Sequence, residues 1–94
     1  MGSDGDYRSM LEEFLTASAR LQAELGGAVH AGRLGDAERV THTLKSMARM
    51  VGAAGFADAC ARAEHDAAKG HMPDPAALGR LLADAQAAVQ EALA

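Results

Sequence analysis

Residues 37–53 read AERVTHTLKSMARMVGA, and their apolar side chains recur at the spacing of an α-helix. At about 100° per residue, the apolar positions fall between about 140° and 220° from His42. These positions are Ala37, Val40, Leu44, Met47 and Val51. This side therefore faces a core, and His42 lies opposite it, exposed near the middle of the helix. We predict that the helix runs from Asp36, as N-cap, to about Val51, with Gly52 as the stop signal.

Three further segments of helical period surround this one. The first covers about residues 6–31, with Asp6 as a candidate N-cap. The next covers about residues 56–69, and the last follows Asp74 as N-cap, with Pro75 at the first helical position. No segment alternates with a period of two, so strands are not indicated. We predict an all-α fold, an antiparallel up-down-up-down four-helix bundle.

The composition fits one small helical domain. The chain has 94 residues, of which 49% are hydrophobic and 3% aromatic, and this length supports a single core. We expect residues 6–94 to form the bundle and residues 1–5 to be a disordered N-terminus or a remnant of cloning. Neither a membrane span nor a signal peptide is recognisable, so we expect a cytoplasmic protein. The high content of Ala, Gly and Arg is typical of a GC-rich bacterial genome.

Positive charge gathers around His42 in a chain that is acidic as a whole. The net charge of −4 argues against nucleic acid as a partner. Residues 33–49 nevertheless contain four basic and two acidic residues, whereas the whole chain contains 9 and 13. No glycine-rich phosphate loop is present, so we expect no nucleotide binding. The sequence therefore predicts a local basic patch around one exposed imidazole.

This pattern is compatible with phosphoryl transfer. An imidazole nitrogen is a nucleophile that can form a covalent intermediate, and phosphoryl transfer depends mainly on charge stabilisation and access. Lys45, three residues after His42, lies on the adjacent surface and could neutralise phosphoryl oxygens. The other residues of this face are candidates for binding a partner protein: Arg39, Ser46, Arg49 and Met50. An exposed histidine with basic neighbours is also common on ordinary helix surfaces, so spacing alone leaves both interpretations open.

The remaining metal-binding and thiol side chains give weaker signals. Cys60 is the only cysteine, which excludes an intramolecular disulfide and a cysteine-based zinc site. Its place on an apolar stripe predicts a buried thiol. Glu64, His65 and Asp66 are adjacent in sequence and therefore point in different directions on a helix. We expect the chain itself to bind neither a metal ion nor a cofactor.

The quoted stretch resembles the signature of histidine-containing phosphotransfer (HPt) domains, roughly A-H-x-L-K-G-x-A-x-x-x-G-A. The matching residues are His42, Leu44, Lys45, Ala48, Gly52 and Ala53, and Cys60 and Glu64 match the helix that follows in the family. The family fold is a four-helix bundle of about this size, so the resemblance covers nearly the whole chain. Two positions depart from the pattern: Ser46 replaces the usual glycine, and Thr41 replaces the common alanine before the histidine.

The resemblance implies a role in a multistep phosphorelay of two-component signalling. His42 would carry the phosphoryl group between the aspartates of response-regulator receiver domains, with Lys45 beside the phosphoryl group. Gly52 would be a helix-end or close-packing glycine. The partners would be a receiver domain, which would hold Mg²⁺, and an upstream histidine kinase, including a hybrid kinase.

A further expectation follows from comparison with sensor kinases. Those proteins usually place Glu or Asp directly after the phospho-accepting histidine, whereas this chain has Thr43. We therefore expect a phosphoryl carrier without autokinase activity, rather than an enzyme. The charged outer face favours a monomer. The alternative is a non-catalytic helical adaptor that binds a signalling partner through the same face.

Overall fold

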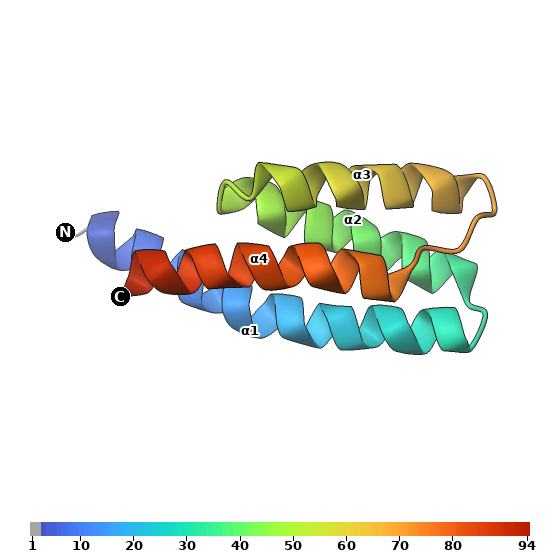
Figure 1. Ribbon diagram of the computed structural model, residues 1–94, viewed down its shortest axis with the longest axis horizontal. Coiled ribbons are helices and arrows are strands. Elements are labelled where there is room, and N and C mark those ends of the chain that lie inside the picture. The colour runs from blue at the N-terminus through green and yellow to red at the C-terminus, as the bar shows by residue number, and fades with distance from the viewer. Residues whose placement is uncertain (1–2) are drawn as a thin grey trace.

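The computed structural model describes residues 3–94, which form four α-helices and no strand (Figure 1). They are α1 (Ser3–His30), α2 (Leu34–Met50), α3 (Ala54–Ala68) and α4 (Pro75–Leu93). Each helix packs against the next in sequence, and α1 also packs against α4 and closes the ring. Helices α2 and α3 share the most extensive contact. The predicted all-α four-helix bundle is confirmed.

Three helix starts differ from the sequence prediction. Helix α1 begins at Ser3, so Asp6 lies inside the helix and is not its N-cap. Helix α2 begins at Leu34, and Asp36 lies in its first turn, with Oδ2 3.3 Å from Nε of Arg33. Helix α3 begins at Ala54, two residues early. The error at α2 has a physical reason, because a carboxylate in the first turn is also favoured by the helix dipole. Residues 1 and 2 lie outside the described part of the chain, and the predicted domain boundary at residue 6 stays a prediction.

The start of α4 follows the prediction. Asp74 Oδ1 accepts hydrogen bonds from the backbone N–H groups of Ala76, at 3.0 Å, and Ala77, at 3.2 Å. Pro75 occupies the first helical position, where its missing N–H costs nothing. Asp74 is therefore a true N-cap that fixes where α4 begins.

The end of α2 depends on Gly52. This residue has φ +77°, and the backbone N–H of Ala53 donates to the carbonyl oxygen of Ala48 at 2.8 Å. That hydrogen bond and the left-handed glycine are the features of a Schellman cap. A β-carbon at Gly52 would have open space around it. Gly52 is thus a helix-end glycine, and not a close-packing one.

The core fixes the rotation of α2. Ala37, Val40 and Leu44 are buried, as predicted, and Met47 and Val51 pack partly against the core. Ala48 is buried as well, although it lay outside the predicted stripe. Thr41 is also fully buried, and its hydroxyl donates to backbone oxygens of the preceding turn, Ala37 at 3.0 Å and Glu38 at 2.9 Å. With this side held inside, the opposite side of α2 faces solvent.

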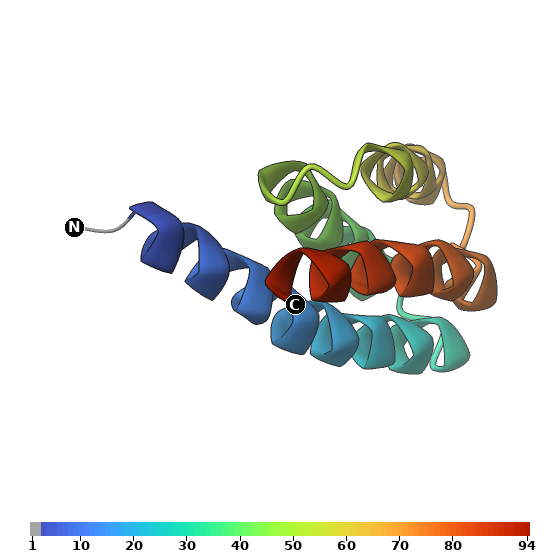
Figure 2. The same cartoon turned by 60° about the vertical axis from the view of Figure 1, so that its left-hand side comes forward.

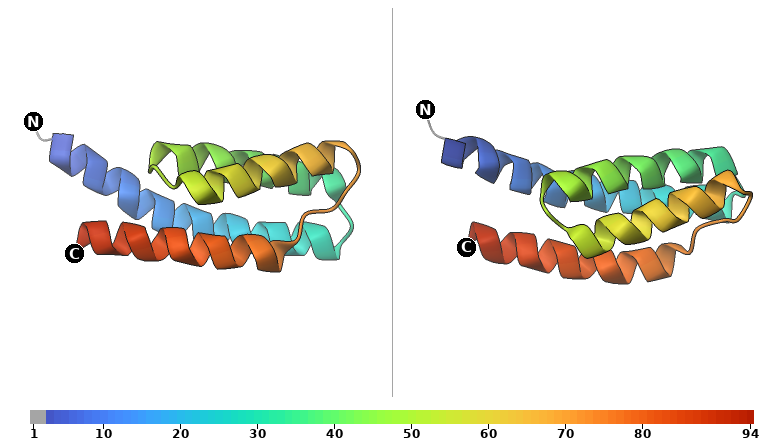
Figure 3. Two further views of the ribbon diagram at one scale, coloured as in Figure 1. Left: turned by 45° about the horizontal axis from the view of Figure 1, so that its top comes forward. Right: turned by 90° about the horizontal axis from the view of Figure 1, so that it is seen from above.

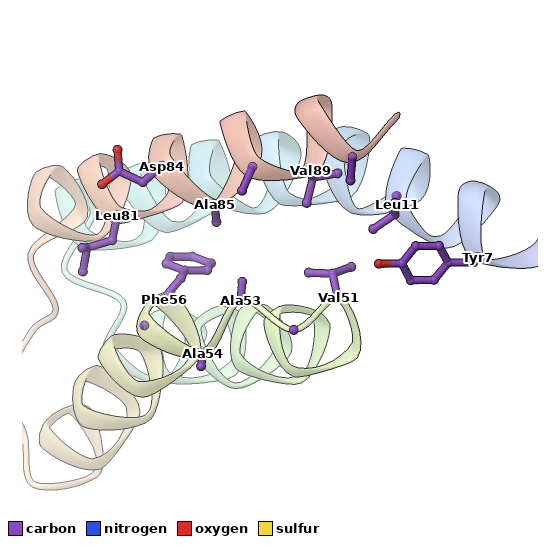
Figure 4. A pocket seen from close by; sticks show the side chains of 14 residues that line it. Tyr7, Leu11, Val51, Ala53, Ala54, Phe56, Leu81, Asp84, Ala85 and Val89 are labelled. Carbon is purple, nitrogen blue, oxygen red and sulfur yellow. The ribbon is translucent and has the colours of Figure 1, made fainter. Parts of the chain in front are cut away.

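The N-terminal turns of α1 project past the rest of the bundle (Figures 2 and 3). Beside them, an apolar cavity of about 360 Å³ lies between α1, the α2–α3 turn and α4. Figure 4 shows Phe56 pointing from α3 towards α4, and Tyr7 at the α1 edge of this cavity. His42 is not part of its lining. Among residues 3–94, no helix has both the length and the apolar character needed to span a bilayer.

Candidate functional site

His42 lies on the exposed side of α2, as its spacing predicts. Its side chain is 58% exposed, and its Nδ1 atom is 2.6 Å from Oε2 of Glu64 on α3. The partner comes from α3 because α2 and α3 run side by side over most of their length (Figure 3). The imidazole is therefore exposed, but its contact with Glu64 through Nδ1 holds it in one orientation.

Glu64 joins His42 to Lys45. While Oε2 contacts the histidine, Oε1 accepts a hydrogen bond from Nζ of Lys45 at 2.5 Å. The side chains of Lys45 and Glu64 are only 17% and 21% exposed. The hydrogen bond from Lys45, and to a lesser extent that from His42, lowers the pKa of Glu64 below its ordinary value, although burial acts in the opposite direction. Glu64 is therefore an ionised carboxylate at neutral pH.

This carboxylate selects the tautomer of the neutral His42 ring. An ionised carboxylate can only accept hydrogen bonds, so the short contact requires a hydrogen on Nδ1. In a neutral imidazole, the other nitrogen then carries the free lone pair. The site therefore presents one nucleophilic atom, Nε2 of His42, on the exposed side of α2.

A shallow hollow lies beside the ring. It has a volume of about 280 Å³ and is lined by Gly35, Glu38, Arg39, His42 and Glu64. Side chains on a helix lean towards its N-terminus, so the ring of His42 covers the turn that contains Glu38 and Arg39. The hollow is thus the space next to the imidazole, and Gly35 keeps it free of a side chain.

The candidate partner-binding residues share the exposed side of α2. Arg39 lines the hollow beside His42. One turn after His42, the exposed Ser46 donates its hydroxyl hydrogen to the backbone oxygen of His42 at 3.3 Å. Arg49 is exposed, and Met50 is 64% exposed above a small apolar hollow between α1 and α2. These four residues therefore form one surface around His42, whereas Lys45 is turned towards α3.

Glu64 is the site residue that sequence reasoning missed. The sequence matches Glu64 to the family pattern and makes it a weak candidate metal ligand, but does not assign it to the site around His42. Its position held a usable signal, because Glu64 lies one turn after the buried Cys60, at the edge of the apolar stripe of α3. An acidic residue at such an edge can reach across to a basic residue on the packed neighbour, which here is Lys45.

The other ionisable candidates take no part in the site. Cys60 is fully buried, as predicted, and burial, followed by the negative charge of Glu64, raises the pKa of its thiol to about 12. The thiol is therefore protonated and unreactive. Across the residues that the structure describes, no three His, Cys, Asp or Glu side chains come together as a metal site.

The comparisons with known proteins identify the family. The Hpt domain model matches residues 9–92, which is nearly the whole chain. Searches of curated proteins and of solved structures gave no significant match. The family match agrees with the four-helix fold and with an exposed histidine on the second helix. The chain therefore belongs to the Hpt domain family and is a histidine phosphotransfer domain of a phosphorelay.

Proposed function

We propose that His42 is the phospho-accepting residue and that its Nε2 atom receives the phosphoryl group. The observation that carries this proposal is the 2.6 Å contact between Nδ1 of His42 and Oε2 of Glu64. Because the contact occupies Nδ1, only Nε2 is free to attack. Hpt domains in general interact with receiver domains and kinases, so the donor we propose is the aspartyl phosphate of a receiver domain.

The transfer step needs no cofactor bound to this chain. The Nε2 lone pair forms a bond to phosphorus while the bond between phosphorus and the aspartyl oxygen breaks, and the receiver carboxylate leaves. The hydrogen on Nδ1 stays in place, so the ring becomes positively charged as the new bond forms. Glu64 faces that charge directly and stabilises it. A Mg²⁺ ion on the receiver would neutralise the phosphoryl oxygens.

Lys45 contributes charge stabilisation through Glu64. Its Nζ atom pairs with Oε1 of the carboxylate, which keeps Glu64 ionised and offsets its negative charge. Without Lys45, the carboxylate would repel an incoming phosphoryl group more strongly. Because of Lys45, the Glu64 carboxylate can stay next to His42 even though His42 has to accept a negatively charged phosphoryl group.

We propose that the chain is a phosphoryl carrier without autokinase activity. The residue after His42 is Thr43, whose hydroxyl donates to the backbone oxygen of Arg39 at 3.1 Å, so no carboxylate base follows the histidine. A separate histidine kinase would supply the phosphoryl group through a receiver domain. The receiver would dock on the exposed side of α2, over Arg39, Ser46, Arg49 and Met50. A monomer and a cytoplasmic location stay predictions from the sequence.

An intact-mass phosphotransfer assay tests this proposal. The chain is mixed with Mg²⁺ and a panel of phosphorylated receiver domains, and the mass of each protein is recorded over time. We expect a gain of one phosphoryl group that is stable in base and lost in acid. His42→Gln should abolish the gain and keep the helical circular dichroism spectrum, because the substituted side chain is exposed.

His65→Gln is the matched control. His65 is exposed on α3 next to Glu64 in sequence, so its replacement should leave the mass gain unchanged. Phosphorylation of the His42→Gln variant would contradict the proposal. Tight binding of a receiver without any mass gain would instead indicate the non-catalytic adaptor.

A further inference from the structure

Two basic residues lie within one helical turn of His42, and they differ in exposure and in ion pairing. Lys45 is 17% exposed, and its Nζ atom is committed to Glu64 at 2.5 Å. Arg39 is exposed, and no carboxylate oxygen of the side chains that the structure describes lies within 4.0 Å of its guanidinium nitrogens. The cation that can move to meet a new anion is therefore Arg39.

Position also favours Arg39. It lines the hollow beside His42, whereas Lys45 does not. Residues three apart on a helix have β-carbons about 5–6 Å from each other, and the ring of His42 leans towards the turn of Arg39. A group attached to Nε2 of His42 would thus extend beside a long and unpaired arginine side chain.

The surrounding charges make a free cation necessary. A phosphoryl group adds roughly two negative charges at neutral pH, and the same hollow already contains the carboxylates of Glu38 and Glu64. Lys45 offsets Glu64 only. Arg39 also lines a second hollow, together with Arg33 and the carboxylates of Glu24 and Asp36. Neither of these two carboxylates lies within ion-pair distance of Arg39.

We propose that Arg39 is a catalytic residue whose guanidinium contacts the phosphoryl oxygens on Nε2 of His42, and that Lys45 is a positioning residue that acts through Glu64. This inference rests on the proposed function. The planar guanidinium can give two parallel hydrogen bonds to a phosphoryl group. Charge on the transferring group resides on its equatorial oxygens, so the same contact serves both the transfer step and the phosphorylated state.

The test uses the chain without any receiver domain. Phosphoramidate is a small phosphoryl donor, and its nitrogen–phosphorus bond breaks as Nε2 attacks, with ammonia as the leaving group after proton uptake from water. Phosphorus NMR then follows the phosphohistidine signal, its rate of appearance and the pH midpoint at which the phosphoryl group titrates. The variants are Arg39→Ala, Arg39→Lys and Lys45→Ala. The control is Arg80→Ala, an exposed position on α4, which does not pack against α2.

We expect Arg39→Ala to raise the titration midpoint, because the phosphoryl oxygens lose a cation and hold their proton to higher pH. The rate of phosphorylation should fall roughly 2- to 5-fold, the size of an exposed charge pair. Arg39→Lys should restore part of both effects, since it keeps the charge but not the planar fork. Arg80→Ala should behave as the wild-type chain.

Each other outcome overturns a distinct statement. A wild-type chain that gives no phosphohistidine signal contradicts the proposed function itself. A normal signal with the same midpoint in Arg39→Ala and Arg80→Ala overturns the role of Arg39 and leaves the proposed function intact. A midpoint that shifts in Lys45→Ala but not in Arg39→Ala would make Lys45 the phosphoryl-binding cation, and would overturn the division of roles.

Discussion

The two helix pairs of the bundle use polar side chains in different ways. Between α1 and α4, Gln22 Nε2 donates to the backbone oxygen of Pro75 at 2.7 Å, and Gln86 Nε2 donates to Oγ of Ser18 at 3.2 Å. All four groups are uncharged. Ser18 is fully buried, so the contact with Gln86 ends inside the protein. A third contact between these helices is exposed: Nη2 of Arg8 donates to the backbone oxygen of Leu93 at 2.7 Å, and its acceptor is again a neutral carbonyl.

Between α2 and α3, by contrast, two side chains of opposite charge, Lys45 and Glu64, pair with each other and lead to the surface. Lys45, Glu64 and His42 form a chain of contacts whose exposure rises from 17% at Lys45 to 58% at His42. These contacts end at Nε2 of His42, which has no hydrogen-bond partner among residues 3–94. The comparison teaches that polar contacts between α1 and α4 hold helices together, whereas those between α2 and α3 orient a nucleophile.

Of the variants that test this comparison, removal of the Glu64 carboxylate should have the largest effect on the rate of phosphorylation. In Glu64→Ala, the ring of His42 loses the one side-chain hydrogen bond that it makes within residues 3–94, and both tautomers become available. We expect the rate of phosphorylation by a receiver domain to fall roughly 10- to 100-fold, the loss typical of groups that orient a functional histidine. Intact mass against time measures this rate.

Two variants sharpen the result. Glu64→Gln keeps an oxygen that can accept from Nδ1, so we expect it to retain more activity than Glu64→Ala. Glu91→Ala, at an exposed position on α4, has the same change of charge and should leave the rate unchanged. Equal rates in Glu64→Ala and Glu91→Ala would remove the distinction between the two helix pairs.

Lys45→Ala should have the next largest effect. The substitution leaves Glu64 with His42 as its only partner and makes the site more negative. We expect transfer to slow by roughly 10-fold, with docking of the receiver retained. Residues of one network are not additive, so the Lys45→Ala, Glu64→Ala double variant should be little slower than Glu64→Ala alone. Fully additive losses would show that Lys45 acts independently of Glu64.

The sequence was sufficient to predict the fold and the exposed side of α2. The apolar positions from Ala37 to Val51 set the rotation of the helix, because the apolar stripe of an amphipathic helix faces the core. His42 follows from the same geometry. Helix starts were harder, since Asp36 in a first turn and Asp74 at an N-cap are both favourable, and a sequence does not separate them.

The state of Lys45 could not be read from the sequence in the same way. Spacing along α2 places Lys45 beside His42, and this suggested a free cation. Whether it is free depends on α3, and the alignment of α3 against α2 is set by packing around residues such as Phe56 and Cys60. Contacts between helices are decided by that packing, so the pairing of Glu64 with Lys45 and His42 depends on both helices together.

A substitution between α1 and α4 should lower the stability of the fold and leave the rate of phosphorylation unchanged. Ser18→Ala leaves Nε2 of Gln86 without its acceptor in a partly buried position. We expect the free energy of unfolding to fall by about 1 kcal/mol, measured by urea denaturation, with the rate of phosphorylation unchanged. A slower transfer reaction in this folded variant would mean that the two helix pairs are coupled.

The smallest effect should be a dependence of stability on pH that comes from Glu64. The pKa of Glu64 is lower in the folded chain than its ordinary value of 4.5, chiefly because of the hydrogen bond from Lys45. The unfolded chain therefore takes up this proton more readily than the folded one. The stabilisation is fully present above the ordinary value and is lost as the pH falls through the lowered one.

Glu64→Gln isolates that contribution. Its difference from the wild-type chain in free energy of unfolding should shrink as the pH falls below the ordinary value of 4.5 and through the lowered pKa of Glu64, as wild-type Glu64 becomes protonated. The Ser18→Ala difference should stay constant over the same range, because neither Ser18 nor Gln86 titrates. Parallel pH profiles for both variants would show that the charged pair stabilises the fold no differently from the uncharged one. The distinction between the two helix pairs would then rest on the chemistry of His42 alone.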